Sequence, residues 1–125
     1  MDLAFEWVAE NGIPTQADYK YTGRDETCKA FTSALTEQGC LDIMADSVDY
    51  SSGDYTNVKA AVAEFGTIAI AVAADFNWQS YSSGVVHSSN TGLNHGVAVV
   101  GWTQIDGEDA FIVRNSWGSG WGQSG

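Results

Sequence analysis

Basic residues are scarce in this sequence. The 125 residues include five lysines and arginines against sixteen aspartates and glutamates, which gives a formal net charge of −11. The phosphates of nucleic acids and the headgroups of anionic membranes repel such a chain. We therefore expect neither nucleic acid nor a membrane among its partners.

Long apolar runs are also missing. A helix that crosses a bilayer needs about 20 consecutive apolar residues, and no segment of this sequence provides them. The first residues also lack the basic and apolar stretches of a secretory signal. These absences favour a mature or truncated soluble chain. Its length and its hydrophobic content of 44% are sufficient for one compact unit with a modest core.

Cysteine and histidine are rare as well. Cys28, Cys40, His87 and His95 lack the spacing of a zinc site, so we expect no metal and no other cofactor. The two cysteines are separated by residues 29–39 and could form a disulfide in an oxidising compartment. Neither cysteine stands in a setting typical of a catalytic nucleophile.

The apolar residues that are present follow a helical period in two places. Residues 2–11 place apolar side chains four positions apart, and the Asn-Gly pair at 11–12 is suited to a left-handed helix end. Residues 55–65 carry one apolar face and end before Gly66. The sequence thus predicts a short N-terminal helix and one further helix.

Strand patterns dominate after Gly66. After Thr67, residues 68–74 alternate larger and smaller apolar side chains, which is typical of a strand buried on both faces. Residues 96–102 and 110–113 are also apolar and flank an Asp-Gly pair at 106–107, a strong signal for a two-residue hairpin turn. The sequence therefore predicts an antiparallel sheet.

The predicted hairpin brings two polar residues together. His95 stands just before one strand and Asn115 just after its partner, so folding back at the turn places them side by side. A single histidine in this position is more often a structural residue than a catalyst. Paired with an amide, however, it suits a general base whose ring is held in orientation.

Two segments carry a resemblance to a known family. The sequence LNHGVAVVGW at 93–102 and the sequence VRNSWGSGWG at 113–122 resemble the histidine and asparagine motifs of papain-like cysteine peptidases. Shorter stretches resemble other parts of the family in the same order, at 11–13, 19–23, 66–70 and 81–86. The resemblance covers nearly the whole chain.

The resemblance implies an α+β fold in two parts. Residues 1–14 would be the remnant of a helix of the family's left domain, and residues 15–125 would form a truncated right domain with an antiparallel, barrel-like sheet. The family's nucleophilic cysteine and its glutamine lie on a segment that should precede Met1. The chain is thus expected to carry the histidine and the asparagine without the cysteine.

Site roles also follow from the resemblance. His95 would be the acid–base residue, Asn115 would orient its ring, and Trp117 would shield their hydrogen bond from water, which strengthens it. Ala71 and Leu93 match positions that line the pocket for the substrate's second residue. Asn94 is expected to begin a strand rather than to take part in catalysis.

The remaining rare residues are given structural roles. In the family, the cysteine matched by Cys28 pairs with one in the left domain. Cys40 has no counterpart, so a bridge between Cys28 and Cys40 is the simplest hypothesis. His87 is expected in an exposed loop, and the tryptophans outside the motif are expected in the core or in pocket walls: Trp7, Trp78 and Trp102.

Two functions remain open at this point. The chain is interpreted as a portion of a papain-like cysteine endopeptidase, inactive without its cysteine segment and acting on peptides or proteins in a lysosome, in a vacuole or outside the cell. The alternative is a catalytically silent binding or structural module with the same fold. In both cases, the missing left-domain segment or another protein chain is expected to cover an exposed apolar face.

Overall fold

The computed structural model describes residues 2–31, 55–88 and 90–125. The chain divides into two compact units, Met1–Ser47 and Val48–Gly125, rather than the one unit expected from its length. All large buried apolar side chains among the described residues belong to the second unit. This division differs from the domain limit between residues 14 and 15, which stays a prediction.

The first unit contains the predicted N-terminal helix. Helix α1 spans Asp2–Asn11. Gly12 ends it with φ of 76°, and its N–H donates to the Val8 carbonyl over 2.7 Å. This left-handed conformation carries no steric penalty at glycine, which explains why the helix ends there.

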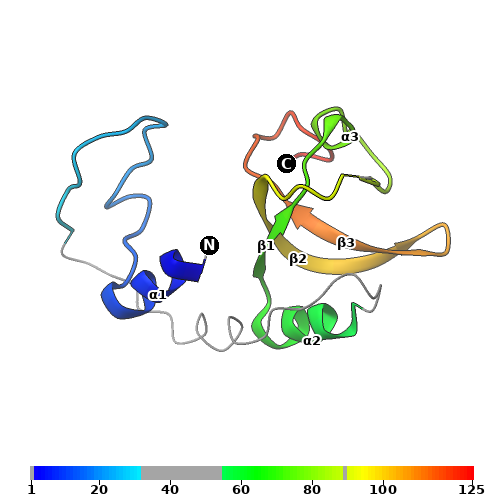
Figure 1. Cartoon of the computed structure of the whole chain (residues 1–125), viewed down its shortest axis with the longest axis horizontal. Coiled ribbons are helices and arrows are strands. Elements are labelled where there is room, and N and C mark those ends of the chain that lie inside the picture. The colour runs from blue at the N-terminus through cyan, green and yellow to red at the C-terminus, as the bar shows by residue number, and fades with distance from the viewer. Residues whose placement is uncertain (1, 32–54, 89) are drawn as a thin grey trace. The chain divides into compact units, whose positions relative to one another are not determined.

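The second unit is built on a three-stranded antiparallel sheet. Strands β1 (Ile68–Val72), β2 (His95–Ile105) and β3 (Glu108–Arg114) lie in the order β1-β2-β3, with β2 in the middle (Figure 1). Asp106 and Gly107 join β2 to β3 with φ of 52° and 84°. Two consecutive positive φ angles are typical of a type I′ turn, whose twist matches that of the two flanking strands. The predicted hairpin is therefore confirmed.

One face of this sheet carries the core. Helix α2 (Thr56–Phe65) contacts β1 and β2 and buries Val58 and Val62. Val99, in the middle strand, is fully buried. A second cluster of Ala74, Trp78 and Val97 forms the other part of the core. No helix of the described residues is long and apolar enough to cross a membrane.

The prediction of a first strand buried on both faces is wrong. Strand β1 covers only five residues, and Ala69 and Ala71 on its second face are exposed. In the described part of the second unit, the core forms on the other face alone, so the small alanine side chains are left in solvent. The all-apolar composition therefore does not reflect double burial here.

A third helix was not predicted. Helix α3 (Phe76–Gln79) has a single turn. The Asp75 carboxylate caps it by accepting from the backbone N–H groups of Asn77 and Trp78, over 3.0 and 3.2 Å. Four residues are too few to show a helical period, and only the cap favours this helix in the sequence.

The tryptophans outside the motif divide between core and surface. Trp78 is 8% exposed and belongs to the core as expected, whereas Trp7 and Trp102 are 51% and 43% exposed. Trp7 and Trp102 therefore do not lie in the core, and a place for them in pocket walls stays a prediction. Trp102 lies beyond the last β1–β2 pair, Ile68 with Val99, so only β3 flanks it within the sheet.

An ion pair joins helix α2 to strand β3. The Lys59 ammonium lies 2.6 Å from an Asp109 carboxylate oxygen, and Gln104 donates to the other oxygen over 3.2 Å. The hydrogen bond and the charge of Lys59, together with the Gln104 hydrogen bond, hold the pKa of Asp109 below its ordinary value of 3.8. The pair thus favours the charged carboxylate.

Replacing Lys59 with methionine should raise the pKa of Asp109 toward its ordinary value. Because the folded-state pKa is the lower one, the contact stabilises the fold above the unfolded-state pKa, and this contribution is lost as pH falls through the folded-state pKa. Titration of the Asp109 carboxyl carbon by NMR measures the shift. The variant Gln104→Ala should give a smaller rise, and an unchanged Asp109 pKa in Lys59→Met would contradict the assignment.

Two neighbouring valines test the one-sided core. Val99 is 0% exposed and Val100 is 41% exposed, so the same change removes buried surface at only one of them. We expect Val99→Ala to lower the free energy of unfolding by about 2 kcal/mol, and Val100→Ala to lower it by less than half as much. Urea unfolding followed by tryptophan fluorescence measures both, and equal losses would contradict this description of the core.

Candidate active site

The hairpin brings His95 and Asn115 into contact. His95 is the first residue of β2, and Asn115 follows the last residue of β3. The His95 Nε2 atom lies 2.9 Å from the Asn115 Oδ1 atom, although the two residues are 20 positions apart. The pairing of strands β2 and β3 therefore produces the predicted contact.

The backbone determines which way the Asn115 amide points. The Ser116 N–H donates to Asn115 Oδ1 over 2.7 Å. An N–H group can only donate, so the oxygen of the amide must face Ser116, and it then also faces His95 Nε2. That nitrogen must carry a proton to complete the hydrogen bond. The neutral ring thus has its proton on Nε2 and its lone pair on Nδ1.

This orientation leaves one group unsatisfied. The Asn115 Nδ2 atom is buried and has no hydrogen-bond partner within the described parts of the chain. A buried donor without a partner costs about 1–3 kcal/mol. A flipped amide would instead place Nδ2 against the Ser116 N–H, which can only donate, and would leave the buried oxygen without a donor, which is worse. The observed orientation is therefore the better of two imperfect ones.

Trp117 covers one face of the histidine ring. The two rings stack with centroids 4.8 Å apart and planes 24° from parallel. Trp121 meets Trp117 edge to face at 5.5 Å, and its indole N–H donates to the Trp78 carbonyl over 2.7 Å. Trp121 thus connects Trp117, which covers His95, to the buried Trp78.

Sequence reasoning missed the supporting role of Trp121 and of the Ser116 backbone. The signal for Trp121 is its place in the Trp-Gly-Ser-Gly-Trp-Gly run, four residues after Trp117. Gly122, the last residue of that run, donates its N–H to the Tyr81 carbonyl, and a side chain at Gly122 would meet the Tyr81 ring at 2.9 Å. Glycine is thus required where this segment closes on the loop after α3, beside which the red C-terminal segment lies in Figure 1.

The predicted pocket residues lie next to the histidine in the fold. Ala71 pairs across the sheet with Gly96, and Leu93 stands two positions before His95. Ala71 is exposed, and Leu93 is 70% exposed. The sheet brings Ala71 near His95, Leu93 is close to it along the chain, and the role of both in a substrate pocket stays a prediction.

The cysteines are not joined to this site by any described contact. Cys28 is exposed in the first unit and has no disulfide partner among the described residues. Cys40 lies outside the described residues, so a bridge between the two stays a prediction. His87 is exposed in a loop, as expected, with its Nε2 atom 3.5 Å from a Glu108 oxygen.

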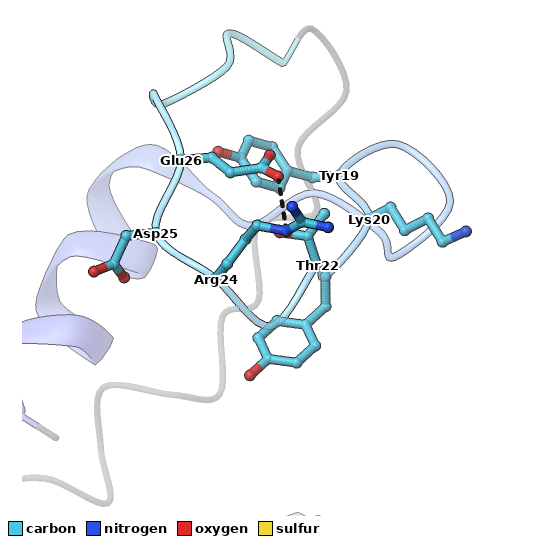
Figure 2. A pocket seen from close by; sticks show the side chains of 7 residues that line it. Tyr19, Lys20, Thr22, Arg24, Asp25 and Glu26 are labelled. Atoms are coloured by element: carbon cyan, nitrogen blue, oxygen red, sulfur yellow. Dashed lines mark ion pairs between the residues drawn. The ribbon is translucent and has the colours of Figure 1, made fainter.

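A surface hollow in the first unit is a separate feature. It has a volume of about 510 Å³, and the side chains of seven residues line it (Figure 2): Tyr19, Lys20, Tyr21, Thr22, Arg24, Asp25 and Glu26. None of the predicted site residues is among them. Of its two lining carboxylates, that of Glu26 is paired with Arg24 and Lys29 of the same loop.

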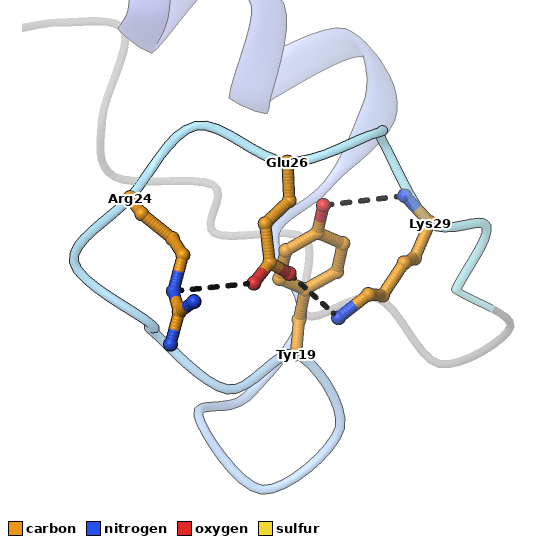
Figure 3. Close-up of polar contacts among 4 residues, drawn as sticks. All are labelled: Tyr19, Arg24, Glu26 and Lys29. Carbon is orange, nitrogen blue, oxygen red and sulfur yellow. Dashed lines mark hydrogen bonds and ion pairs between the residues drawn. The ribbon is translucent and has the colours of Figure 1, made fainter.

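Polar contacts around Glu26 hold this loop together. The Lys29 ammonium lies 3.1 Å from one Glu26 oxygen, and the Arg24 Nε atom lies 3.9 Å from the other (Figure 3). The Lys29 backbone N–H donates to the Tyr19 hydroxyl over 3.2 Å. These contacts are exposed to solvent and are of the kind that contributes little to stability. We assign them a local structural role.

The sequence of this chain is similar to those of known cysteine proteases. The sequence profile described as papain family cysteine protease matches residues 1–125. Cathepsin L 2 of Paramecium tetraurelia is 44% identical over 127 residues, which cover all of this chain and 36% of that protein. A cathepsin L-like peptidase of Aedes aegypti is 38% identical over 133 residues, which cover all of this chain and 37% of that protein.

Solved structures give the same result. Digestive procathepsin L 3 from the larval midgut of Tenebrio molitor matches with a TM-score of 0.78 and 31% identity, over 100% of this chain and 40% of that chain. Bromelain from Ananas comosus matches with a TM-score of 0.74 and 30% identity, over 98% of this chain and 55% of that chain. The chain therefore spans little more than a third of the length of these curated relatives. Its sequence and fold place it in the papain family of cysteine proteases.

Proposed function

We propose that this chain supplies the histidine and the asparagine of a cysteine peptidase site, and that the nucleophilic cysteine belongs to a segment outside this sequence. The observation that carries the proposal is the 2.9 Å contact between His95 Nε2 and Asn115 Oδ1. It uses one ring nitrogen for orientation and leaves the other for proton transfer. Such a division is what a histidine general base requires.

The chemistry proposed for His95 takes place at Nδ1. This atom has no partner within the described residues, and it would accept the proton of the cysteine thiol, leaving a thiolate and an imidazolium. The thiolate attacks the peptide carbonyl, and the imidazolium returns its proton to the leaving amine. Asn115 keeps the ring in place in both charge states, because Nε2 stays protonated throughout.

Trp117 is proposed to protect the His95–Asn115 hydrogen bond. Its indole stacks on the imidazole face at 4.8 Å and is itself 40% exposed, so it stands between the ring and solvent. Excluding water lowers the local dielectric and strengthens the bond it covers. Ala71 and Leu93 are proposed to contact an apolar side chain at the substrate's second residue before the cut.

Exposed apolar residues on α1 support a second part of the proposal. Leu3 and Trp7, four positions apart on this helix, are 80% and 51% exposed. We propose that the segment with the cysteine, or another protein chain, covers them, since such a patch rarely stays open to water.

We also propose a lysosomal, vacuolar or extracellular location, which the similarity to cathepsin L proteins and to a digestive procathepsin supports.

The chain alone should not hydrolyse peptides. Addition of a segment that carries the family's cysteine should produce thiol-dependent cleavage of a peptide with an apolar second residue before the cut. In the supplemented protein, His95→Ala should lower kcat by about 10⁴-fold or more. Catalytic residues act as a unit, so removing one of them removes most of the rate enhancement. His87→Ala is the matched control and should leave kcat unchanged.

Two results would contradict this proposal. Cleavage by the chain alone that is lost on alkylation of Cys28 or Cys40 would show that the nucleophile is already present. A folded, supplemented protein that binds peptide without cleaving it would favour the silent binding module. Peptide binding measured by fluorescence anisotropy in parallel with cleavage separates the two functions.

The histidine tautomer gives a test that needs no activity. We expect the neutral His95 ring to carry its proton on Nε2, and nitrogen-15 NMR of the chain reports this directly. In Asn115→Ala, the ring loses its acceptor and should populate both tautomers. A wild-type ring protonated mainly on Nδ1 would overturn the proton-transfer role assigned to that atom.

A further inference from the structure

Three consecutive residues that follow the motif of Asn115 contact a single tyrosine. The Trp121 ring lies against the Tyr81 ring, with centroids 5.3 Å apart and planes tilted by 46°. The Gly122 N–H donates to the Tyr81 carbonyl over 3.2 Å, and the Gln123 side-chain amide donates to the Tyr81 hydroxyl over 3.4 Å. The ring, the backbone and the hydroxyl of Tyr81 thus each contact a different residue of one segment.

Tyr81 is itself held in place at both ends. It stands two residues after helix α3 and is half-buried. Its backbone N–H donates to the carbonyl of the buried Trp78 over 3.3 Å, and its hydroxyl donates to the Gly84 carbonyl over 2.8 Å. A residue that packs on Tyr81 therefore packs on a fixed support.

The segment that contacts Tyr81 forms a loop that closes on itself. This 115–125 loop begins with Asn115, whose N–H donates to the Gly125 carbonyl over 3.3 Å. The Gly125 N–H donates to the Trp121 carbonyl over 2.8 Å, and the Trp121 N–H donates to the Gly118 carbonyl over 3.2 Å. Movement of Trp121 is therefore transmitted to the whole loop.

The 115–125 loop carries both side chains that hold the histidine. Asn115 bonds to the His95 ring and Trp117 stacks on it. Within the described residues, the other hydrogen bonds and ring contacts that join this loop to the rest of the second unit go to Trp78 and Tyr81. These two residues are thus the supports of the site on the side of α3.

The contacts of Trp78 and Tyr81 with Trp121 are complementary. Trp78 accepts the indole N–H at its carbonyl and stacks on the indole with centroids 6.2 Å apart. A ring held by one hydrogen bond and a parallel neighbour can still slide and turn about that bond. The tilted Tyr81 ring, together with the hydrogen bond from the next backbone N–H, restricts both movements.

We propose that Tyr81 is a positioning residue for the cover over His95. Its ring fixes Trp121, whose edge-to-face contact at 5.5 Å keeps the Trp117 indole on the imidazole. The ring carries this role rather than the hydroxyl, because the Gln123 contact is long for a hydrogen bond. The inference rests on the proposed function, since it gives Tyr81 a part in keeping water from the His95–Asn115 hydrogen bond.

Kinetics on the supplemented protein provide the first test. We expect Tyr81→Leu to lower kcat by about 10-fold, since small misplacements of reacting groups cost up to about 100-fold. Tyr81→Phe keeps the ring and should stay within about twofold of the wild type. KM should change by less than about twofold in both variants, because Tyr81 is not among the residues proposed to contact substrate.

A matched control separates positioning from stability. Tyr55 also makes a ring contact in the second unit, with Phe111 at 5.7 Å, but it does not contact the 115–125 loop. Tyr55→Leu should lower the urea midpoint and leave kcat unchanged. If Tyr55→Leu and Tyr81→Leu lose kcat in proportion to their loss of stability, Tyr81 has a structural role only and the inference is wrong.

A second variant displaces the loop while keeping the tyrosine. A methyl group at Gly122 would meet the Tyr81 ring at 2.9 Å, so Gly122→Ala should push the loop away from Tyr81 and reproduce the loss of kcat. Gly122 also has a positive φ, of 57°. Gly66→Ala is the control for this strain, because Gly66 has φ of 85° and open space around it, and kcat should not change.

NMR of the unsupplemented chain provides a readout that is independent of catalysis. In Tyr81→Leu and in Gly122→Ala, the His95 Nε2 proton should exchange about 10-fold faster and the Trp117 indole resonance should shift. Both signals should match the wild type in Tyr55→Leu. Unchanged signals in folded Tyr81→Leu and Gly122→Ala variants would overturn the inference. Failure of the proposed function alone would appear differently, as an inactive wild-type supplemented protein whose His95 proton exchange still responds to Tyr81.

Discussion

The pairing of β2 with β3 is the interaction on which the rest of the site depends. It begins at the turn of Asp106 and Gly107, where two positive φ angles reverse the chain in the sense that strand twist requires. From there, seven paired positions lead back to Arg114 opposite Ala98, past one irregularity between Val99 and Gly101. A slip of one residue would move Asn115 to the other face of the sheet and away from His95.

The register is held by burial on one face. Val97 and Val99 point into the core and are 7% and 0% exposed, whereas Val100 between Val99 and Gly101 is 41% exposed. Any alternative register would bring buried valines into water, at a cost of roughly 1.5–3 kcal/mol for each side chain. The apolar residues after His95 therefore do more than fill the core, because they also determine where the imidazole stands.

The site combines contacts of different origin around one ring. Asn115 comes from the end of β3 and Trp117 from the segment after it, whereas Asn94 directly precedes the histidine in the sequence. Their supports differ as well, since Ser116 orients the amide, Trp121 braces the indole and Ala74 anchors Asn94. Of the two ring nitrogens of His95, only Nδ1 remains open within the described residues, which is the arrangement that the proposed proton transfer requires.

The sequence by itself determined the helix end at Gly12, the hairpin at Asp106 and Gly107, and the meeting of His95 with Asn115. These features follow from local backbone preferences and from the pairing that a short turn enforces. Only the tertiary structure decided which tryptophans are buried, because Trp78 packs against Val97 while Trp102 extends past the end of β1. It also decided that Ala69 and Ala71 face solvent and that Asn94 bonds to Ala74, 20 residues away. Burial and long-range hydrogen bonds depend on which segments meet in space, and no local pattern in the sequence contains that information.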